Sequence, residues 1–177
     1  PFEDNSFDKV FCLGVLQHTP DFEASVKALI AKTKFGGEIV VDFYPIKGWW
    51  TKIHAKYLLR PITKRLSHTR LMELIEVNID WLIKAHFGLH RIGLGVFARF
   101  LPIADIQGTI PRNLSAKEQK EWVVLDTFDM FSPEYDNPQR INDVAAMFER
   151  HGAEVTFAGF EYFEGGSAAV VRGIKGV

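Results

Sequence analysis

The 177-residue sequence predicts an α/β fold: parallel strands, then a helical insertion, then a C-terminal antiparallel hairpin. A strand–helix–strand order opens the chain, helical periodicity dominates its middle, and two strand-like runs joined by glycines close it. We therefore expect residues 1–45 and 115–177 to form one sheet-containing core. Residues 46–114 are expected to form a helical lid inserted between strands of that core.

The first block contains one strand–helix–strand unit. The apolar run Val10–Val15 predicts a strand, and a helix with Thr19 as N-cap and Pro20 at its first position follows. Gly36-Gly37 ends the helix, and the apolar run Glu38–Tyr44 predicts a parallel strand covered on both faces. Because ligands of open α/β sheets bind beyond the carboxyl ends of strands, we expect a site after the first strand.

The middle of the chain reads as helical. Pro61 is expected to break or kink one helical stretch, and Gly88 to end the next. A short helix is predicted over Ile92–Leu101. The apolar positions at helical spacing are Leu71, Leu74, Ile75, Ile79, Leu82 and Ile83.

The last part of the chain returns to the sheet. A capping box over Ser115–Glu118 begins a helix that runs toward Leu125, and residues 127–140 read as an ordered loop. Asn142 is predicted to cap a further helix that Gly152 closes. The antiparallel hairpin is predicted from the runs Glu154–Phe163 and Ser167–Ile174 around Gly165-Gly166.

The composition is that of a soluble globular protein, with 47% hydrophobic and 24% charged residues and a net charge of −1. This balance gives no support for nucleic-acid binding, which depends on many phosphate-neutralising cations, so no nucleic-acid partner is expected. The single cysteine, Cys12, lies in an apolar run and is expected to be a core residue. A chain without disulfides fits a reducing compartment, and we expect a cytoplasmic protein.

Several phrases of the sequence resemble, in order, those of class I S-adenosylmethionine-dependent methyltransferases. Residues 1–8 match the family phrase L-P-F-x-D-x-S-F-D from its proline onward. Val15–Asp21 and Lys34–Gly37 then occupy the places of V-L-x-H-x-x-D and K-P-G-G, with Phe35 replacing the proline. A phrase over Leu125–Tyr135 resembles one branch of the family, so that the likeness covers residues 1–44 and roughly 122–175.

The resemblance implies the second half of a Rossmann-like methyltransferase sheet with S-adenosylmethionine as cofactor. It also implies that Leu13, Gly14 and Val15 line the adenine and methionine side of the cofactor, although plain strand-end packing is the alternative. The glycine-rich loop of the family and its acidic ribose-binding residue would lie upstream of Pro1. We therefore expect a methyltransferase fragment that is inactive alone, from an enzyme acting on a small-molecule or lipid-like acceptor.

Four side chains are candidates for the reaction itself. His18 follows the first strand, where an imidazole can accept a proton from the acceptor, although a helix-terminal histidine bonded to backbone is the alternative. Asp126, Asp129 and Tyr135 are candidate acceptor contacts on the returning segment. Loop capping by the aspartates and a core tyrosine are the alternative for these three.

No metal site is predicted. His86 and His90 are four residues apart, a spacing that allows chelation from one helix. However, Gly88 lies between them and no neighbouring carboxylate completes a site.

A basic segment over residues 47–70 leaves a second function open. It holds seven lysines and arginines without an acid, interleaved with Trp49 and Trp50. Such a stretch can lie on an anionic membrane, so a non-catalytic peripheral module with membrane contact is the alternative to the enzyme. Cationic side chains covering an ordinary apolar stripe would also explain the pattern. A third alternative is a polyamine synthase, an enzyme with a related fold. It would need an acidic substrate pocket, which the sequence does not identify.

Overall fold

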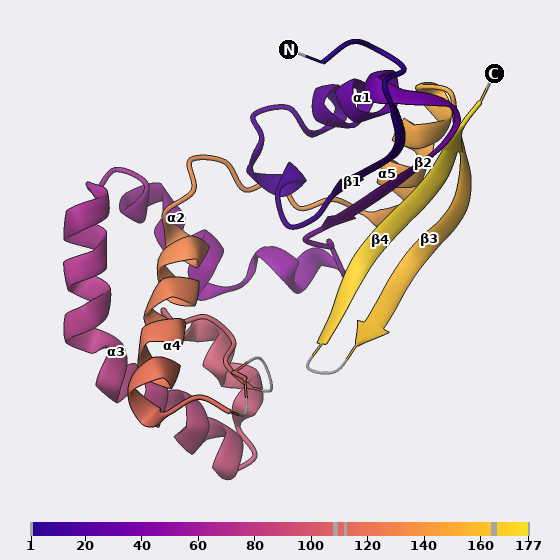
Figure 1. The fold of residues 1–177 in the computed structure, drawn as a ribbon. Helices are drawn as coiled ribbons and strands as arrows, with labels where there is room; N and C mark the ends of the chain where they lie inside the picture. The colour runs from indigo at the N-terminus through magenta and orange to yellow at the C-terminus, as the bar shows by residue number, and fades with distance from the viewer. Residues whose placement is uncertain (1, 108–109, 112, 164–165, 177) are drawn as a thin grey trace. The chain divides into compact units, whose positions relative to one another are not determined.

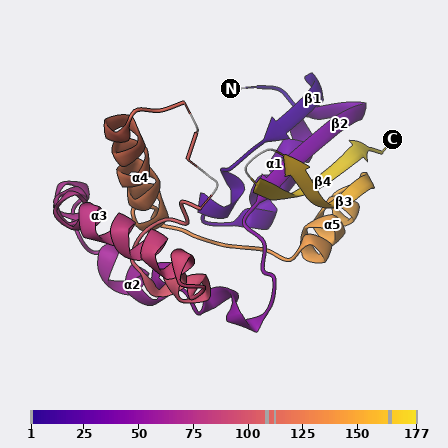
Figure 2. The ribbon, with the colours of Figure 1, turned by 90° about the horizontal axis from the view of Figure 1, so that it is seen from below.

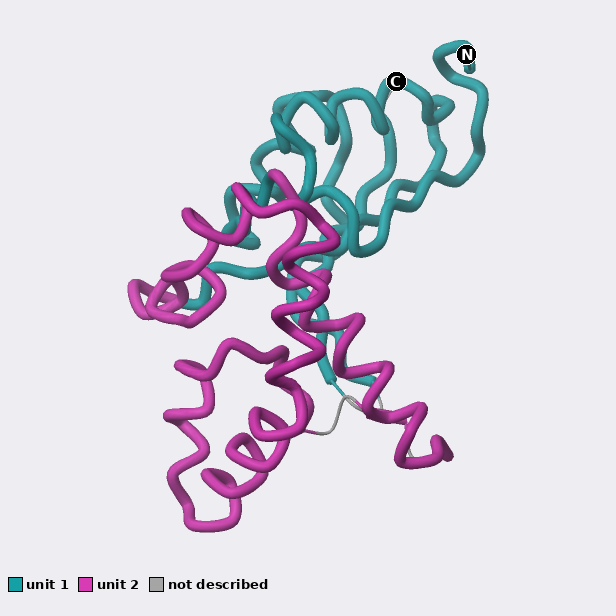
Figure 3. The backbone as a smooth tube through the Cα atoms, turned by 90° about the vertical axis from the view of Figure 1, so that its left-hand side faces the viewer, with its two compact units in different colours: residues 1–47, 135–177 teal, residues 48–134 magenta. Residues whose placement is uncertain are grey.

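The computed structural model describes residues 2–107, 110–111, 113–163 and 166–176. Pro1 and Gly165, which entered the sequence analysis, lie outside these residues. The chain divides into two units (Figures 1 and 3): a sheet unit, residues 1–47 and 135–177, and a helical unit, residues 48–134.

The sheet unit contains a mixed four-stranded sheet in the order β1-β2-β4-β3. β1 and β2 are parallel, with Val10 opposite Ile39, whereas β4 is antiparallel to both of its neighbours. The predicted fold class, parallel strands followed by an antiparallel hairpin, is therefore confirmed. The strands are β1 (Phe7–Cys12), β2 (Thr33–Phe43), β3 (Ala153–Phe163) and β4 (Gly166–Lys175).

Two helices, α1 (Phe22–Lys32) and α5 (Ile141–Arg150), pack on one face of this sheet (Figure 2). Phe148 of α5 is fully buried against β4, where the missing side chain of Gly173 makes room for its ring. The core residues that are fully buried are Val26, Ile39, Val41, Val144, Phe148, Ala169 and Val171. This core fixes the carboxyl ends of β1 and β2, where the candidate site lies.

Both predicted helix caps in the sheet unit are wrong. A short 3₁₀ turn over Leu16–His18 precedes α1, and the Thr19 hydroxyl donates to the Leu16 carbonyl 2.7 Å away instead of capping the helix. Asp21 caps α1 by accepting a hydrogen bond from the Ala24 amide at 2.9 Å. At α5 the chain enters through Arg140 without a side-chain cap, so Asn142 lies inside the helix.

The helical unit contains α2 (Ala55–Thr63), α3 (His68–Arg91) and α4 (Ala116–Phe131), with 3₁₀ turns at Trp49–Lys52 and Gly95–Phe100. The capping box that opens α4 is confirmed, because the Ser115 and Glu118 side chains bond each other's backbone amides. Gly88 does not end α3, since a glycine inside a helix costs only about 1 kcal/mol relative to alanine.

The fourth helix is longer than predicted and belongs to the helical unit. α4 continues to Phe131, so residues 127–131 are helical and not part of a loop. Its buried residues Val123 and Phe131 share one core with Leu71 of α3, which explains why α4 groups with the helices. The structure thus places residues 115–134 in the helical unit, whereas the sequence analysis assigned them to the sheet core. Within the described ranges, no helix combines the length and apolarity needed to cross a membrane.

Candidate functional site

The turn after β1 forms the first part of the candidate site. Gly14 has a φ of +70°, which glycine adopts without strain, and its amide donates a hydrogen bond to the Asp42 carboxylate. A side chain added at Gly14 would meet nothing within 4 Å. Leu13 and Val15 flank the turn and are 53% and 52% exposed. Asp42 therefore holds the turn to β2. The space around Gly14 is open, and the exposed apolar side chains of Leu13 and Val15 flank it.

A buried amide follows this turn in the 3₁₀ turn Leu16–His18. Gln17 is 0% exposed, and neither polar atom of its side chain finds a hydrogen-bond partner among the described residues. Its backbone carbonyl accepts a hydrogen bond from the Asn137 amide at 2.7 Å. An unpaired buried amide costs about 1–3 kcal/mol, so these two atoms mark a place for an ordered water molecule.

His18 is oriented by the segment that follows the helical unit. Its Nδ1 lies 3.1 Å from the Tyr135 carbonyl oxygen, and its ring stands edge-on to Tyr44 with centroids 5.7 Å apart. Because a carbonyl only accepts, the neutral imidazole carries its proton on Nδ1 and leaves Nε2 with a free lone pair. The structure thus joins two predicted site residues, His18 and Tyr135.

A cavity of about 600 Å³ opens beyond β2, and we call it the β2–α5 cavity. Two of its lining residues are basic, Lys47 and Arg140, and two are aromatic, Phe160 and Tyr162. The Lys47 ammonium lies 5.4 Å from the centroid of the Phe160 ring. The lining is completed by Pro45, Ile46, Ile141, Asn142 and Ser167. Cations beside aromatic rings are suited to a ligand that combines negative charge with flat rings.

The segment 135–140 connects the turn to the cavity. The Asn137 side chain donates to the Thr19 carbonyl at 2.8 Å, and the Gln139 amide donates to the Tyr44 carbonyl at 3.0 Å. The next residue, Arg140, lines the β2–α5 cavity. The turn after β1 and the β2–α5 cavity therefore both belong to the sheet unit, and the segment 135–140 contacts residues of each.

The other two predicted acceptor residues lie elsewhere. Asp126 and Asp129 are on α4 in the helical unit, whereas Tyr135 belongs to the sheet unit. Burial raises the pKa of the Asp126 carboxyl, and the nearby Asp129 charge raises it further. The three residues therefore do not form one loop cluster of the kind that the sequence analysis assumed.

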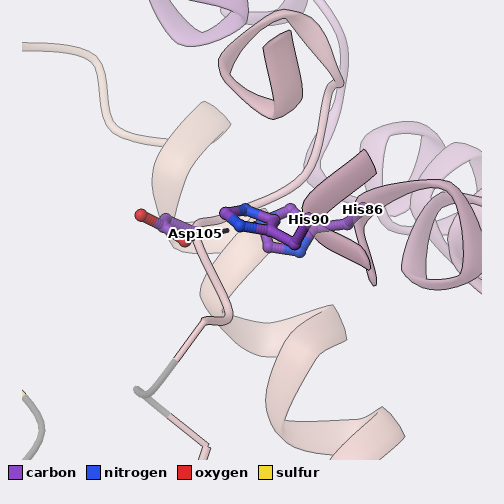
Figure 4. Close-up of side chains that lie close together, drawn as sticks. All are labelled: His86, His90 and Asp105. Atoms are coloured by element: carbon purple, nitrogen blue, oxygen red, sulfur yellow. Dashed lines mark ion pairs between the residues drawn. The ribbon is translucent and has the colours of Figure 1, made fainter. Parts of the chain in front are cut away.

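A third cluster joins His86, His90 and Asp105 within the helical unit (Figure 4). The expectation that no carboxylate lies beside the two histidines is wrong, because Asp105 Oδ1 is 3.5 Å from His86 Nε2. Burial lowers the pKa of His86 and favours its neutral form, while the Asp105 charge acts in the opposite direction.

Sequence reasoning missed Gln17, Asp42 and Arg140. Asp42 ends an apolar strand, and that position alone is a signal for a residue at the ligand-binding edge of a sheet. Gln17 and Arg140 carry no such signal, because their roles depend on the connecting segment that folds back beside them.

Comparison with known proteins confirms the resemblance found in the sequence. Residues 1–41 match the family model described as "Methyltransferase domain". These residues contain β1, α1 and most of β2 and hence the turn at Gly14. The sequence prediction of a class I methyltransferase is therefore confirmed for this part of the chain.

Two curated relatives carry the name "tRNA U34 carboxymethyltransferase". The protein from Nautilia profundicola is 33% identical over 88 residues, which cover 49% of this chain and 28% of the relative. The protein from Sulfurovum sp. is 23% identical over 141 residues, which cover 78% of this chain and 40% of the relative. The chain therefore spans less than half the length of either relative. Among solved structures, a methyltransferase from Methanosarcina mazei matches with a TM-score of 0.47 at 14% identity, covering 99% of this chain and 62% of that one.

These names correct the expected partners. The sequence analysis expected a small-molecule or lipid-like acceptor, membrane contact and no nucleic acid, whereas both relatives are named for a tRNA nucleotide. The net charge of −1 averages a basic segment with acidic ones. Because local basic surface, and not the net charge, decides whether a protein binds phosphates, this value does not exclude a nucleic-acid partner.

Proposed function

We propose that this chain, whose residues 1–41 match the methyltransferase domain family, is part of an enzyme that alkylates a tRNA nucleotide with an S-adenosylmethionine-type donor. The observation that carries the proposal is a pair of features that follow the first two strands of the sheet unit. An open glycine turn follows β1, a cavity lined by cations and aromatic rings lies after β2, and the segment 135–140 bonds residues that follow each strand.

The residues at the turn fit the cofactor. Space at Gly14 admits a ligand close to the backbone, and the exposed side chains of Leu13 and Val15 offer apolar contact to an adenine ring. We assign the predicted cofactor contacts Leu13, Gly14 and Val15 to this role.

The β2–α5 cavity fits a nucleotide of an RNA acceptor. Lys47 and Arg140 can contact phosphates, while Phe160 and Tyr162 present faces on which a base can stack. Stacking of one base on an aromatic side chain contributes about 1–3 kcal/mol. The acceptor in this proposal is thus a nucleotide that is flipped or single-stranded when it binds.

The basic segment supports an RNA acceptor with further exposed cations. Arg60 is excluded from this role, because it is 8% exposed and donates to the Pro133 carbonyl at 2.7 Å. The remaining cations can neutralise phosphates without any base specificity. Those on the helical unit that are exposed are Lys52, Lys64, Arg65 and Arg70.

His18 is proposed as the general base, positioned by the Tyr135 carbonyl. When bound, the cofactor supplies an electrophilic carbon on a sulfonium, and the protein mainly aligns the acceptor and excludes water. The free Nε2 of His18 takes a proton from an acceptor that must lose one. Tyr135 holds the ring in this tautomer, so its part is positioning. Acceptor contact by Asp126 and Asp129 stays a prediction.

A matched pair of glycine variants tests the cofactor site. Gly14→Ala in the full-length protein is expected to weaken S-adenosylhomocysteine binding at least tenfold by calorimetry, because the new methyl group enters the ligand space. Gly36→Ala is the control, since Gly36 also has a positive φ, +76°, and also has nothing within 4 Å. Both variants carry a similar backbone strain of about 1 kcal/mol. Equal cofactor affinities in the two variants would contradict the assignment.

A second variant tests the base. His18→Asn retains a side-chain N–H for the Tyr135 carbonyl but has no nitrogen that can accept a proton. We expect the transfer rate to fall by about 100-fold or more, with cofactor affinity unchanged. If the variant keeps the parental transfer rate, His18 is not the base.

A further inference from the structure

Among the described residues, one group of histidine and carboxylate side chains could hold a metal ion, and it lies in the helical unit. His86 and His90 lie one helical turn apart near the end of α3, and Asp105 comes from the segment before α4. One ligand atom from each residue lies within 4.8 Å of the others. Figure 4 shows Asp105 pointing toward the two imidazole rings.

We propose that His86, His90 and Asp105 bind a divalent transition-metal ion such as Zn²⁺. Two imidazoles and one carboxylate are the donor set of many three-ligand sites, which leave one position for water. This site does not depend on the proposed transfer reaction, and it lies entirely within the helical unit.

The local structure prepares the histidines for this role. The rings of His86 and His90 are 4.8 Å apart between centroids and tilted by 37°, so the two side chains already face one another. His86 is 2% exposed, and its Nδ1 has no hydrogen-bond partner among the described residues. Its Nε2 faces Asp105, and burial of the ring keeps that nitrogen inside the cluster.

Gly95 is part of the same arrangement. A side chain at this position would lie 2.4 Å from His90 Nδ1, so only glycine allows the His90 ring to occupy its place. The two histidines, Asp105 and Gly95 all line one cavity of about 210 Å³, together with His54 and Arg99.

Metal binding requires a small closure of the cluster. Ligand atoms on one tetrahedral Zn²⁺ lie about 3.3 Å apart, given bonds of about 2.0 Å. The 3.5 Å between His86 Nε2 and Asp105 Oδ1 already approaches that distance. The Asp105 side chain is 77% exposed, and its Oδ1 also accepts a hydrogen bond from the Gln107 amide at 3.2 Å, which closure around a metal ion would have to adjust.

Arg99 limits the affinity. Its guanidinium lines the cavity and opposes a cation, although its Nη2 is engaged with the Trp50 carbonyl at 2.7 Å. We therefore expect micromolar binding and not the tight binding of a four-ligand structural zinc site. The metal ion would link the segment around Asp105 to α3 and so stabilise the helical unit.

The test is a zinc titration of tag-free, chelator-treated chain by calorimetry, with thermal unfolding in parallel. We expect one equivalent of Zn²⁺ to bind and the melting temperature to rise with zinc concentration. His90→Asn and Asp105→Asn should each lower the affinity at least about tenfold, because each removes one of three ligands. These two residues are preferred to the buried His86, whose replacement could unfold the unit.

Two controls on α3 distinguish the site from general surface binding. His68→Asn removes an exposed histidine whose ring packs against Phe128, and Asp80→Asn removes an exposed partner of Lys120. Neither should change zinc affinity. Absence of saturable zinc binding would overturn the proposal, as would parental affinity in both His90→Asn and Asp105→Asn.

Discussion

Phe148→Ala is expected to lower the free energy of unfolding of the sheet unit by about 3–5 kcal/mol. The Phe148 side chain is fully buried between α5 and the sheet, and its ring occupies the room left by Gly173 on β4. Its removal leaves a cavity that the surrounding strands cannot close, since Gly173 has no side chain to fill it. Denaturant unfolding followed by circular dichroism measures the loss.

A matched phenylalanine provides the control for this prediction. Phe163 is also in the sheet unit but is 61% exposed at the end of β3, so Phe163→Ala should change stability by less than about 0.5 kcal/mol. Similar losses in the two variants would mean that α5 does not pack on the sheet as described.

Removing both cations of the β2–α5 cavity is expected to weaken tRNA binding about 100-fold at moderate ionic strength. Each of Lys47 and Arg140 is proposed to neutralise one phosphate, so the double variant Lys47→Ala/Arg140→Ala loses two such contacts. The slope of log affinity against log salt should become shallower by roughly 2. Filter binding of the full-length protein over a range of salt concentrations measures both quantities.

The control removes two other exposed lysines. Lys27→Ala/Lys117→Ala makes the same change in net charge at one lysine on α1 and one on α4, neither of which lines the cavity. If both double variants lose the same affinity, the effect is one of overall charge and the cavity is not the acceptor site. Parental affinity in Lys47→Ala/Arg140→Ala would also exclude the cavity.

The sequence alone predicts the sheet well because local signals there agree with the fold. Two apolar runs, around Phe11 and Val40, are separated by a helix, and this order predicts a pair of parallel strands, which the structure contains. The predicted caps at Thr19 and Asn142 failed for a different reason. Each is a suitable capping residue, but α1 is capped locally by Asp21, two residues after Thr19, and α5 begins directly after Arg140, which leaves Asn142 inside the helix.

The site is less predictable because it depends on residues far apart in the chain. Tyr135 contacts His18 over 117 positions, and the partnership of Asn137 with Gln17 follows from the same return of the chain. No periodic pattern in the sequence indicates that residues 135–137 fold back beside residues 17 and 18. For the same reason the sequence does not predict that Asp105 lies beside His86 and His90, although the spacing of the two histidines is recognisable.

The most direct test of the central claim is transfer of a labelled group to tRNA by the full-length protein. Purified protein is incubated with tRNA and one of two donors, S-adenosylmethionine or its carboxymethyl sulfonium analogue. The tRNA nucleosides are then analysed by mass spectrometry. Our account predicts that the label appears in one tRNA nucleoside with at least one donor, and that His18→Asn abolishes most of it. If the tRNA stays unlabelled with both donors while the protein binds S-adenosylhomocysteine, tRNA is not the acceptor. Failure to bind S-adenosylhomocysteine would contradict the proposed cofactor.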